Sequence, residues 1–249
     1  MRLLVDIGNS RVKSAIDDDG ELRPLETFAW QGVFLHEVLA RHWISALEHD
    51  TPTSVHVSNV AGDRLLPNMK AWCVKNWGLE PVSLEKAAEF QGLVNGYSDP
   101  QTLGADRWAA MIGARQICAG PLCVVDSGTA TTVDVIDETG QHIGGAILPG
   151  IYTMRRSLGK YTAALFAADT EIGAFADNTA SGIAGGTGFA SVGAVDRFVR
   201  EAELRVGPVT TILTGGESEI LQSFMLSASR RDPLLVLRGI KAVADAAAG

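Results

Sequence analysis

The chain has 249 residues, a formal net charge of −8 and a hydrophobic fraction of 46%. These values are those of an ordinary globular protein, and the length suits one large domain or two of about 120 residues. A nucleic-acid binder needs clustered Lys and Arg, whereas this chain has only the pairs Arg155-Arg156 and Arg230-Arg231. The chain also has no run of about 18 apolar residues, which a membrane-spanning helix needs. We therefore expect neither a nucleic-acid partner nor a membrane partner. Three cysteines without metal-ligand spacing indicate reduced thiols in a cytoplasmic protein.

The first 118 residues alternate between strand and helix patterns. The stretch 87–100 is irregular, because Gly92, Gly96 and Pro100 interrupt it. Elsewhere the pattern predicts strands over 3–6, 12–16, 21–30, 53–60 and 81–84, and helices over 33–47, 65–77 and 103–118. Three antiparallel strands followed by alternating helices and strands are typical of an α/β layer.

The remaining residues follow a similar order. The pattern predicts strands over 122–126, 132–136, 142–148, 209–213 and 234–236, helices over 151–165, 181–206, 217–226 and 238–247, and a loop over 169–180. One apolar stripe in this half is ambiguous, because it suits either a contact with a second copy of the chain or the cover of its own sheet. Its members are Phe189, Val192, Val195, Phe198 and Val199.

A repeat offset by 120 positions joins the two halves. Residues 3–20 and 123–140 each contain an apolar run, an Asp-x-Gly turn with small hydroxyl or amide residues, a second apolar run and an acidic turn ending in Gly. This order predicts a strand, a tight polar turn and a second strand. Two such hairpins indicate a duplicated domain, and each would aim a carboxylate and backbone N–H groups at a shared nucleotide site.

The first Asp-x-Gly turn has the residue types of a phosphate site. Gly8 has no Cβ and lets the backbone approach a phosphate, while Asn9 and Ser10 add side-chain donors. Lys13 adds a mobile positive charge, and Asp6 suits Mg²⁺ that keeps part of its water shell. Such short Gly motifs are frequent, and the alternative is a plain hairpin with a surface lysine.

Two further turns lie in the second half. Residues 126–132 place three threonines around Gly128, which suits phosphate binding but also a hairpin whose threonines reflect strand propensity. Thr214-Gly215-Gly216 follows an apolar strand and precedes a helix. It is either a loop against adenosine or a turn that packs a strand closely on a helix.

The two hairpins and the late Gly-Gly loop resemble the phosphate and adenosine elements of the acetate and sugar kinase, Hsp70 and actin superfamily. Four motifs resemble the type III pantothenate kinase family, which includes Bvg accessory factor: DIGNSRVK at 6–13, YSDPQTLGADR at 97–107, DSGTATT at 126–132 and GGAILPG at 144–150. The resemblance implies an α/β fold of two duplicated ribonuclease-H-like (actin-like ATPase) domains, each a mixed sheet flanked by helices. Their expected ranges are 1–118 and 119–249.

The same resemblance implies ATP-dependent phosphorylation of pantothenate by a homodimer, with Mg²⁺ and a monovalent cation, K⁺ or NH₄⁺. Asp106 would be the general base, and Asp126 would hold the monovalent cation. The implied pantothenate-binding residues are Tyr97, Gly104, Ala105, Asp106 and Arg107, with Thr179 supplied across the dimer. The implied ATP-binding residues are Asp6, Ile7, Gly8, Asn9, Ser10, Arg11, Val12, Lys13 and Thr129.

Alternatives to these roles stay open. Asp106 lies in the first turn of a predicted helix, where an acid paired with Arg107 or Arg11 often has only a capping role. A phosphatase or an ATP-dependent regulatory protein of the same superfamily would share both hairpins. The segment 97–107 favours the kinase.

Overall fold

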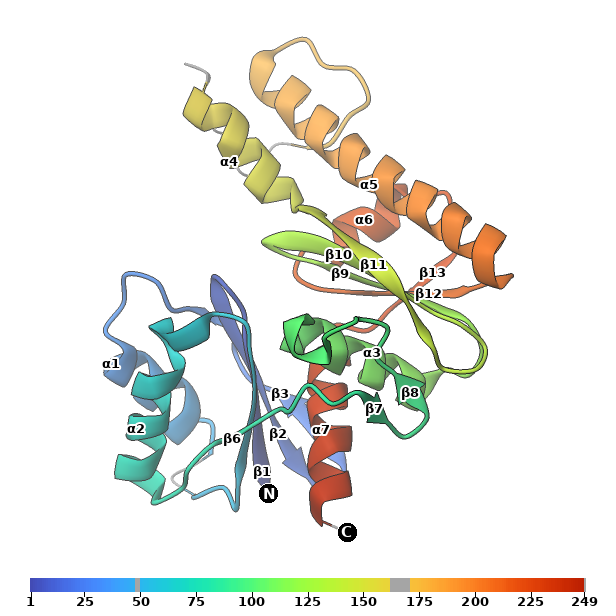
Figure 1. Cartoon of the computed structure of the whole chain (residues 1–249). Coiled ribbons are helices and arrows are strands. Elements are labelled where there is room, and N and C mark those ends of the chain that lie inside the picture. Colours follow the sequence, from blue (N-terminus) through green and yellow to red (C-terminus); the bar gives the residue numbers. More distant parts are fainter. Residues whose placement is uncertain (48–49, 162–170, 249) are drawn as a thin grey trace. The chain divides into compact units, whose positions relative to one another are not determined.

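The structure, a computed structural model, describes residues 1–47, 50–161 and 171–248 (Figure 1). The chain forms two compact units. The first unit comprises Met1–Phe90, Tyr97–Ile117 and Leu234–Gly249, and the second comprises Gln91–Gly96 and Cys118–Pro233. This division differs from the ranges 1–118 and 119–249 at Cys118 and at two longer segments, because the C-terminal helix packs in the first unit and residues 91–96 pack in the second.

The first unit is built on a mixed sheet with the strand order β3-β2-β1-β5-β6, and β4 pairs with β2. β1 runs antiparallel to β2 and parallel to β5. The strand predicted over 21–30 is split in two, since Pro24 ends β3 and has no N–H to continue the ladder. The strands are β1 (Arg2–Ile7), β2 (Arg11–Asp18), β3 (Glu21–Pro24), β4 (Phe28–Ala29), β5 (Val55–Asn59) and β6 (Val82–Ser83).

Helices cover the sheet of the first unit. Trp43 and Trp72 are buried in its core, and the Trp43 indole donates to Ser14 Oγ at 3.1 Å. The helix predicted over 33–47 is shorter and changes from an α-helix to a π-helix. The helices are α1 (Leu35–Leu39), a π-helix (Ala40–Ile44), a 3₁₀ turn (Gly62–Arg64), α2 (Leu66–Trp77), a 3₁₀ turn (Pro100–Thr102), α3 (Ala105–Ile117) and α7 (Leu235–Ala248).

The prediction of a strand over 234–236 is wrong, because Leu235 and Val236 begin α7 and Leu234 lies in the turn before it. Periodicity alone does not separate a short apolar run in a strand from one in a buried helix. Two glycines let α7 pack directly on α3. A Cβ on Gly113 would lie 2.1 Å from the Leu235 carbonyl oxygen, and one on Gly239 would lie 1.8 Å from that of Ala109. This close packing holds the C-terminal helix in the first unit.

The second unit has the strand order β11-β10-β9-β12-β13. Position for position it repeats the first sheet: β9 runs antiparallel to β10 and parallel to β12, and β12 runs parallel to β13. The predicted duplication and the fold class are confirmed. β13 was not predicted, since Ser-Arg-Arg has no apolar alternation. The strands are β9 (Leu122–Ser127), β10 (Ala130–Ile136), β11 (His142–Pro149), β12 (Thr210–Thr214) and β13 (Ser229–Arg231).

The helices of the second unit are α4 (Ile151–Tyr161), α5 (Thr179–Val206) and α6 (Ser218–Phe224). Val192, Val195 and Val199 on α5 are buried in the core of their own unit. For these residues the structure therefore supports the reading that the stripe covers its own sheet. Residues 162–165 of the predicted helix over 151–165, and residues 169–170 of the predicted loop over 169–180, lie outside the described residues.

Two smaller observations complete the fold. Short strands β7 (Glu89–Phe90) and β8 (Leu93–Val94) interrupt the segment predicted as irregular. Burial raises the pKa of the Cys73 and Cys123 thiols to about 12, which agrees with unreactive reduced cysteines. Among the described residues, no helix has both the length and the apolar character needed to cross a bilayer.

Candidate active site

The first Asp-x-Gly turn joins β1 to β2. Asp6 is buried near the end of β1, one residue before Ile7, and its register partner across the hairpin is Lys13. Directly opposed residues of an antiparallel pair project to the same face, so the carboxylate and the ammonium lie on one face of the sheet. Gly8 N donates to Arg11 O at 3.0 Å and closes the turn, which consists of residues 8–10 and is called the first turn below.

The predicted ATP-binding residues of the first turn differ in what they can offer. The Ile7 and Val12 side chains are buried in the hydrophobic core, so only their backbone groups could serve a ligand. Asn9 and Arg11 are exposed, and Ser10 and Lys13 are half-buried.

Three residues that sequence reasoning missed hold the first turn. Trp30 Nε1 donates to Gly8 O at 2.9 Å, and Gln31 Nε2 donates to Asn9 O at 2.9 Å. Arg64 Nη2 donates to Asn9 Oδ1 at 3.0 Å. We call Trp30, Gln31 and Arg64 the Trp30 cluster. The printed sequence contains no signal for it, because its members are distant from the turn along the chain.

The segment 97–107 brings the predicted pantothenate residues together within the first unit. Arg107 is 5% exposed, and its Nη1 donates to the Tyr97 hydroxyl at 2.7 Å. The guanidinium carbon also lies 5.5 Å from the centre of the Tyr97 ring. A guanidinium fixed in this way has the planar donor geometry that matches a carboxylate.

Asp106 lies in the first turn of α3, next to the buried Ala105. Its Oδ1 accepts a hydrogen bond from the Arg107 backbone N–H at 2.7 Å, so the carboxylate does cap the helix start. A Cβ on Gly104 would lie 2.6 Å from Asp106 Oδ1, so a larger residue at this position would displace the carboxylate. The capping contact keeps the carboxylate at the start of the helix, beside the Arg107 and Tyr97 pair.

The second turn, residues 128–129, joins β9 to β10 in the second unit. Thr129 is exposed, and its carbonyl accepts hydrogen bonds from Gly150 N at 3.1 Å and Thr153 Oγ1 at 2.6 Å. Thr131 is instead fully buried and shares a hydrogen bond of 3.1 Å with Ser127 Oγ. Of the first two threonines of this motif, only Thr129 offers an exposed side chain.

Glu217, which sequence reasoning also missed, lies against the second turn. Glu217 is 5% exposed, and its carboxylate accepts hydrogen bonds from the backbone N–H groups of Ile151 at 2.8 Å and Tyr152 at 3.1 Å. These two residues begin α4, where a carboxylate complements the helix dipole. Glu217 N also donates to Ser127 O at 2.9 Å. An acid directly after Gly-Gly, at the start of α6, is the signal that could have pointed to it.

Glycines complete this packing. A Cβ on Gly215 would lie 2.2 Å from Ser127 O and 2.4 Å from Asp126 Oδ1, and Gly215 has φ of +91°. A Cβ on Gly150 would lie 1.8 Å from Gly128 O. Gly215 is therefore a close-packing position, and the Asp126 carboxylate lies directly against it.

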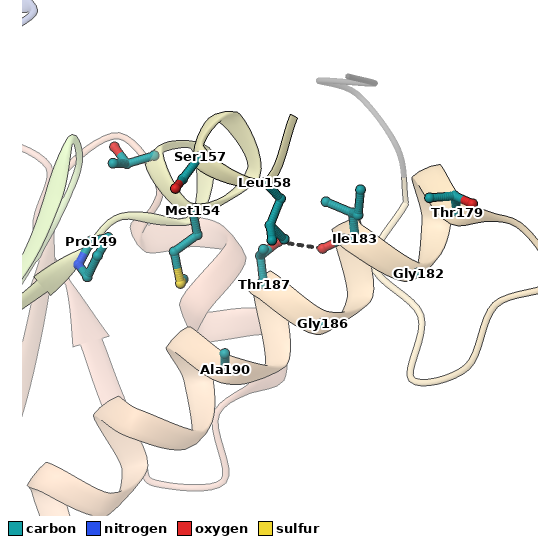
Figure 2. A pocket seen from close by; sticks show the side chains of 11 residues that line it. Pro149, Met154, Ser157, Leu158, Thr179, Gly182, Ile183, Gly186, Thr187 and Ala190 are labelled. Carbon is teal, nitrogen blue, oxygen red and sulfur yellow. Dashed lines mark hydrogen bonds between the residues drawn. The ribbon is translucent and has the colours of Figure 1, made fainter. Parts of the chain in front are cut away.

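Thr179 lies apart from these turns along the second unit, at the start of α5. It lines a cavity of about 760 Å³ between α4 and α5, together with Met154, Leu158, Ile183 and Thr187. Figure 2 shows the mainly apolar side chains of the two helices around this space, and the Thr187 hydroxyl bonded back to the Ile183 carbonyl at 2.7 Å.

Comparisons with known proteins agree with this architecture. The family model described as type III pantothenate kinase matches residues 2–201. A type III pantothenate kinase of Janthinobacterium sp. is 38% identical over 98% of this chain and 97% of its own length. A Baf family protein from Campylobacter jejuni superposes with a TM-score of 0.60 at 24% identity, over 99% of this chain and all of that one. A ROK family glucokinase from Streptomyces griseus superposes with a TM-score of 0.51 at 13% identity, over 98% of both chains.

Two sheets of one topology, each with an Asp-x-Gly turn, define a protein of the actin-like ATPase fold. Within that class the chain belongs to the type III pantothenate kinase family.

Proposed function

We propose that the protein transfers the γ-phosphoryl group of ATP to the hydroxyl of pantothenate, which gives 4'-phosphopantothenate, the first step of coenzyme A synthesis. Family membership supports this activity over a phosphatase or a regulatory ATPase. The observation that carries the proposal is the segment 97–107, in which Asp106 lies beside the buried Arg107 and Tyr97 pair. The test is phosphopantothenate formation from pantothenate and Mg-ATP. No product under varied monovalent salts would contradict the proposal.

Asp106 would accept the proton of the pantothenate hydroxyl as that oxygen attacks phosphorus. Phosphoryl transfer depends mainly on positioning and on neutralising charge, so a carboxylate fixed at a helix start suffices as the base. Arg107 would bind the pantothenate carboxylate, because its planar donors are already fixed by Tyr97. Gly104 and Ala105 would shape the backbone of the same pocket.

Residues 6–13, which include the first turn, would bind the ATP phosphates. In the second unit, Thr129 is the residue that we propose for ATP binding. The carboxylate of Asp6 has the hard oxygen ligands that suit Mg²⁺, which offsets phosphate charge when bound. Lys13 shares its face of the sheet and would neutralise phosphate oxygens directly.

Asp126 would hold K⁺ or NH₄⁺. Its carboxylate lies near the end of β9, against Gly215 and two residues before Gly128, and so offers an oxygen ligand beside the second turn. Activity measured with Na⁺ in place of K⁺ should fall. Full activity in a Na⁺-only buffer would contradict the assignment.

We further propose a homodimer in the cytoplasm, in which Thr179 contacts pantothenate bound to the partner subunit. The apolar cavity beside Thr179 and the 42% exposure of Phe189 support a contact surface on α5. The buried valines of the stripe do not take part, since they pack in their own unit. Sedimentation should give a mass near twice the 26.3 kDa of the chain. A monomer that stays fully active at assay concentration would contradict it.

A further inference from the structure

We propose that Arg64 is a positioning residue of the first turn, which fixes the side-chain amide of Asn9 so that its NH₂ group faces the nucleotide phosphates. This inference rests on the proposed ATP site. Arg64 ends the short 3₁₀ turn Gly62–Arg64 that follows β5.

The Arg64 guanidinium is held by three contacts. Its Nε donates to Ala61 O at 3.0 Å, and its Nη2 donates to Asn9 Oδ1 at 3.0 Å. Its central carbon lies 5.5 Å from the centre of the Trp30 ring, within the range of a cation–π contact. Two bonds from different nitrogens and a flat aromatic support fix the plane of the group.

The bond to Asn9 determines which way the amide points. Arg64 has only donors, so the Asn9 atom that it contacts must be the carbonyl oxygen. The NH₂ group of Asn9 then points away from Arg64. Phosphate oxygens only accept hydrogen bonds from such groups, so a fixed NH₂ suits them, whereas an exposed amide oxygen would repel them.

The backbone of the first turn is oriented by the rest of the Trp30 cluster. Trp30 binds the Gly8 carbonyl and Gln31 binds the Asn9 carbonyl, at 2.9 Å each. Among the described residues no peptide bond is cis, and in a trans peptide the N–H points opposite to the C=O. The N–H groups of Asn9 and Ser10 therefore point away from Trp30 and Gln31. The Trp30 cluster therefore orients the N–H groups of Asn9 and Ser10 toward the side of the turn opposite these carbonyls.

The test measures the affinity for a non-hydrolysable ATP analogue and for adenosine. Arg64→Ala should weaken binding of the analogue about tenfold, as expected when a fixed hydrogen bond to a charged group becomes mobile. Adenosine binding and the KM for pantothenate should not change, because neither involves the phosphates. Arg64→Lys keeps the charge but cannot make both bonds at once, so it should also lose affinity, to a smaller extent.

A double-mutant cycle with Asn9→Ala tests whether Arg64 acts through Asn9. If it does, Arg64→Ala adds no further loss in the Asn9→Ala background. Additive losses would overturn the inference, because they would mean that Arg64 acts independently of Asn9.

The matched control is Arg23→Ala. Arg23 is an exposed arginine of the same unit that donates to Ala46 O at 3.3 Å, so this variant removes the same charge without touching the turn. Its affinity for the analogue should equal that of the wild type. Equal affinity of wild type and Arg64→Ala, or a parallel loss of adenosine binding and thermal stability, would overturn the inference. A wild-type protein that does not bind the analogue would instead contradict the proposed ATP site, and this inference with it.

Discussion

The two units share a strand order but hold their Asp-x-Gly turns differently. In the first unit the turn is held by polar side chains, Trp30, Gln31 and Arg64, which donate to its carbonyl and amide oxygens. In the second unit the turn is held by close backbone packing at Gly150 and Gly215, and by the buried carboxylate of Glu217.

This difference shows that the topology of a duplicated domain is kept more easily than the contacts around its turns. The strand register places Ser58 beside Asp6 and Thr214 beside Asp126, so these two positions are equivalent in the two sheets. Counting onward, Ala61 stands where the second unit has Glu217. The first unit therefore lacks the buried acid and instead uses its side-chain donors. Hydrogen bonds to exposed groups tolerate adjustment, whereas close packing of backbone on backbone does not.

The largest expected effect concerns the acceptor chemistry, which we assign to the first unit alone. Asp106→Asn should lower kcat by about 10²–10⁴-fold, because asparagine keeps the size but cannot accept a proton. Binding of an ATP analogue should remain. Asp63→Asn is the control, since Asp63 is an exposed acid in the first turn of the 3₁₀ segment of the same unit. Wild-type turnover of Asp106→Asn would reduce Asp106 to a helix cap.

The second effect tests the close packing of the second turn. Gly215→Ala should lower the free energy of unfolding by at least about 2 kcal/mol, because the Cβ would collide with Ser127 O at a positive φ. Gly216→Ala is the matched control, since among the described residues no atom lies within 4 Å of its added Cβ. Both are measured by chemical denaturation.

A glycine substitution within the first turn should be milder. A Cβ on Gly8 would lie 3.2 Å from Arg11 O, which a small backbone shift relieves. Gly8→Ala should therefore cost less stability than Gly215→Ala and mainly weaken ATP binding. Equal losses of stability at Gly8 and Gly215 would contradict the contrast between the two units.

A third effect concerns Glu217. Glu217→Gln keeps the shape but removes the charge that complements the start of α4, and should lower the free energy of unfolding by about 1–2 kcal/mol. Glu219→Gln serves as the control, because Glu219 is an exposed acid of the neighbouring helix turn. An identical stability for the two variants would mean that the buried carboxylate contributes no more than a surface one.

The duplicated hairpins and the order of the sheets could be predicted, because apolar runs and Asp-x-Gly turns are local signals. The contacts that hold the turns could not. Trp30 lies 22 residues from Gly8, Arg64 lies 55 residues from Asn9, and Glu217 lies 66 residues from Ile151. β13 escaped prediction for another reason: it is a short strand whose two arginines carry no apolar signal. Partners brought together only by the fold leave no pattern in a single sequence.

The smallest expected effect concerns the packing of α7 in the first unit. Asp245 on α7 pairs with Arg2 on β1 and with Lys241, whose Nζ lies 2.6 Å from Asp245 Oδ2. Asp245→Asn should lower the free energy of unfolding by less than about 1 kcal/mol at neutral pH, because the carboxylate is partly exposed and solvent screens the pair. Asp50→Asn, at an exposed acid of the same unit, is the control.

The pH dependence identifies this contribution. Burial disfavours the charged form of Asp245, but the hydrogen bonds from Lys241 and Arg2 outweigh it, and the pKa of Asp245 lies below its ordinary value. A carboxylate whose pKa is lowered by folding stabilises the fold above its unfolded pKa of about 3.9, and the contribution is lost as the pH falls through the folded value. The stability difference between wild type and Asp245→Asn should therefore be present at pH 7 and shrink toward zero in strong acid. Added salt should reduce it at pH 7 as well. A difference that persists unchanged in acid would mean that Asp245 holds α7 by packing and not by its charge.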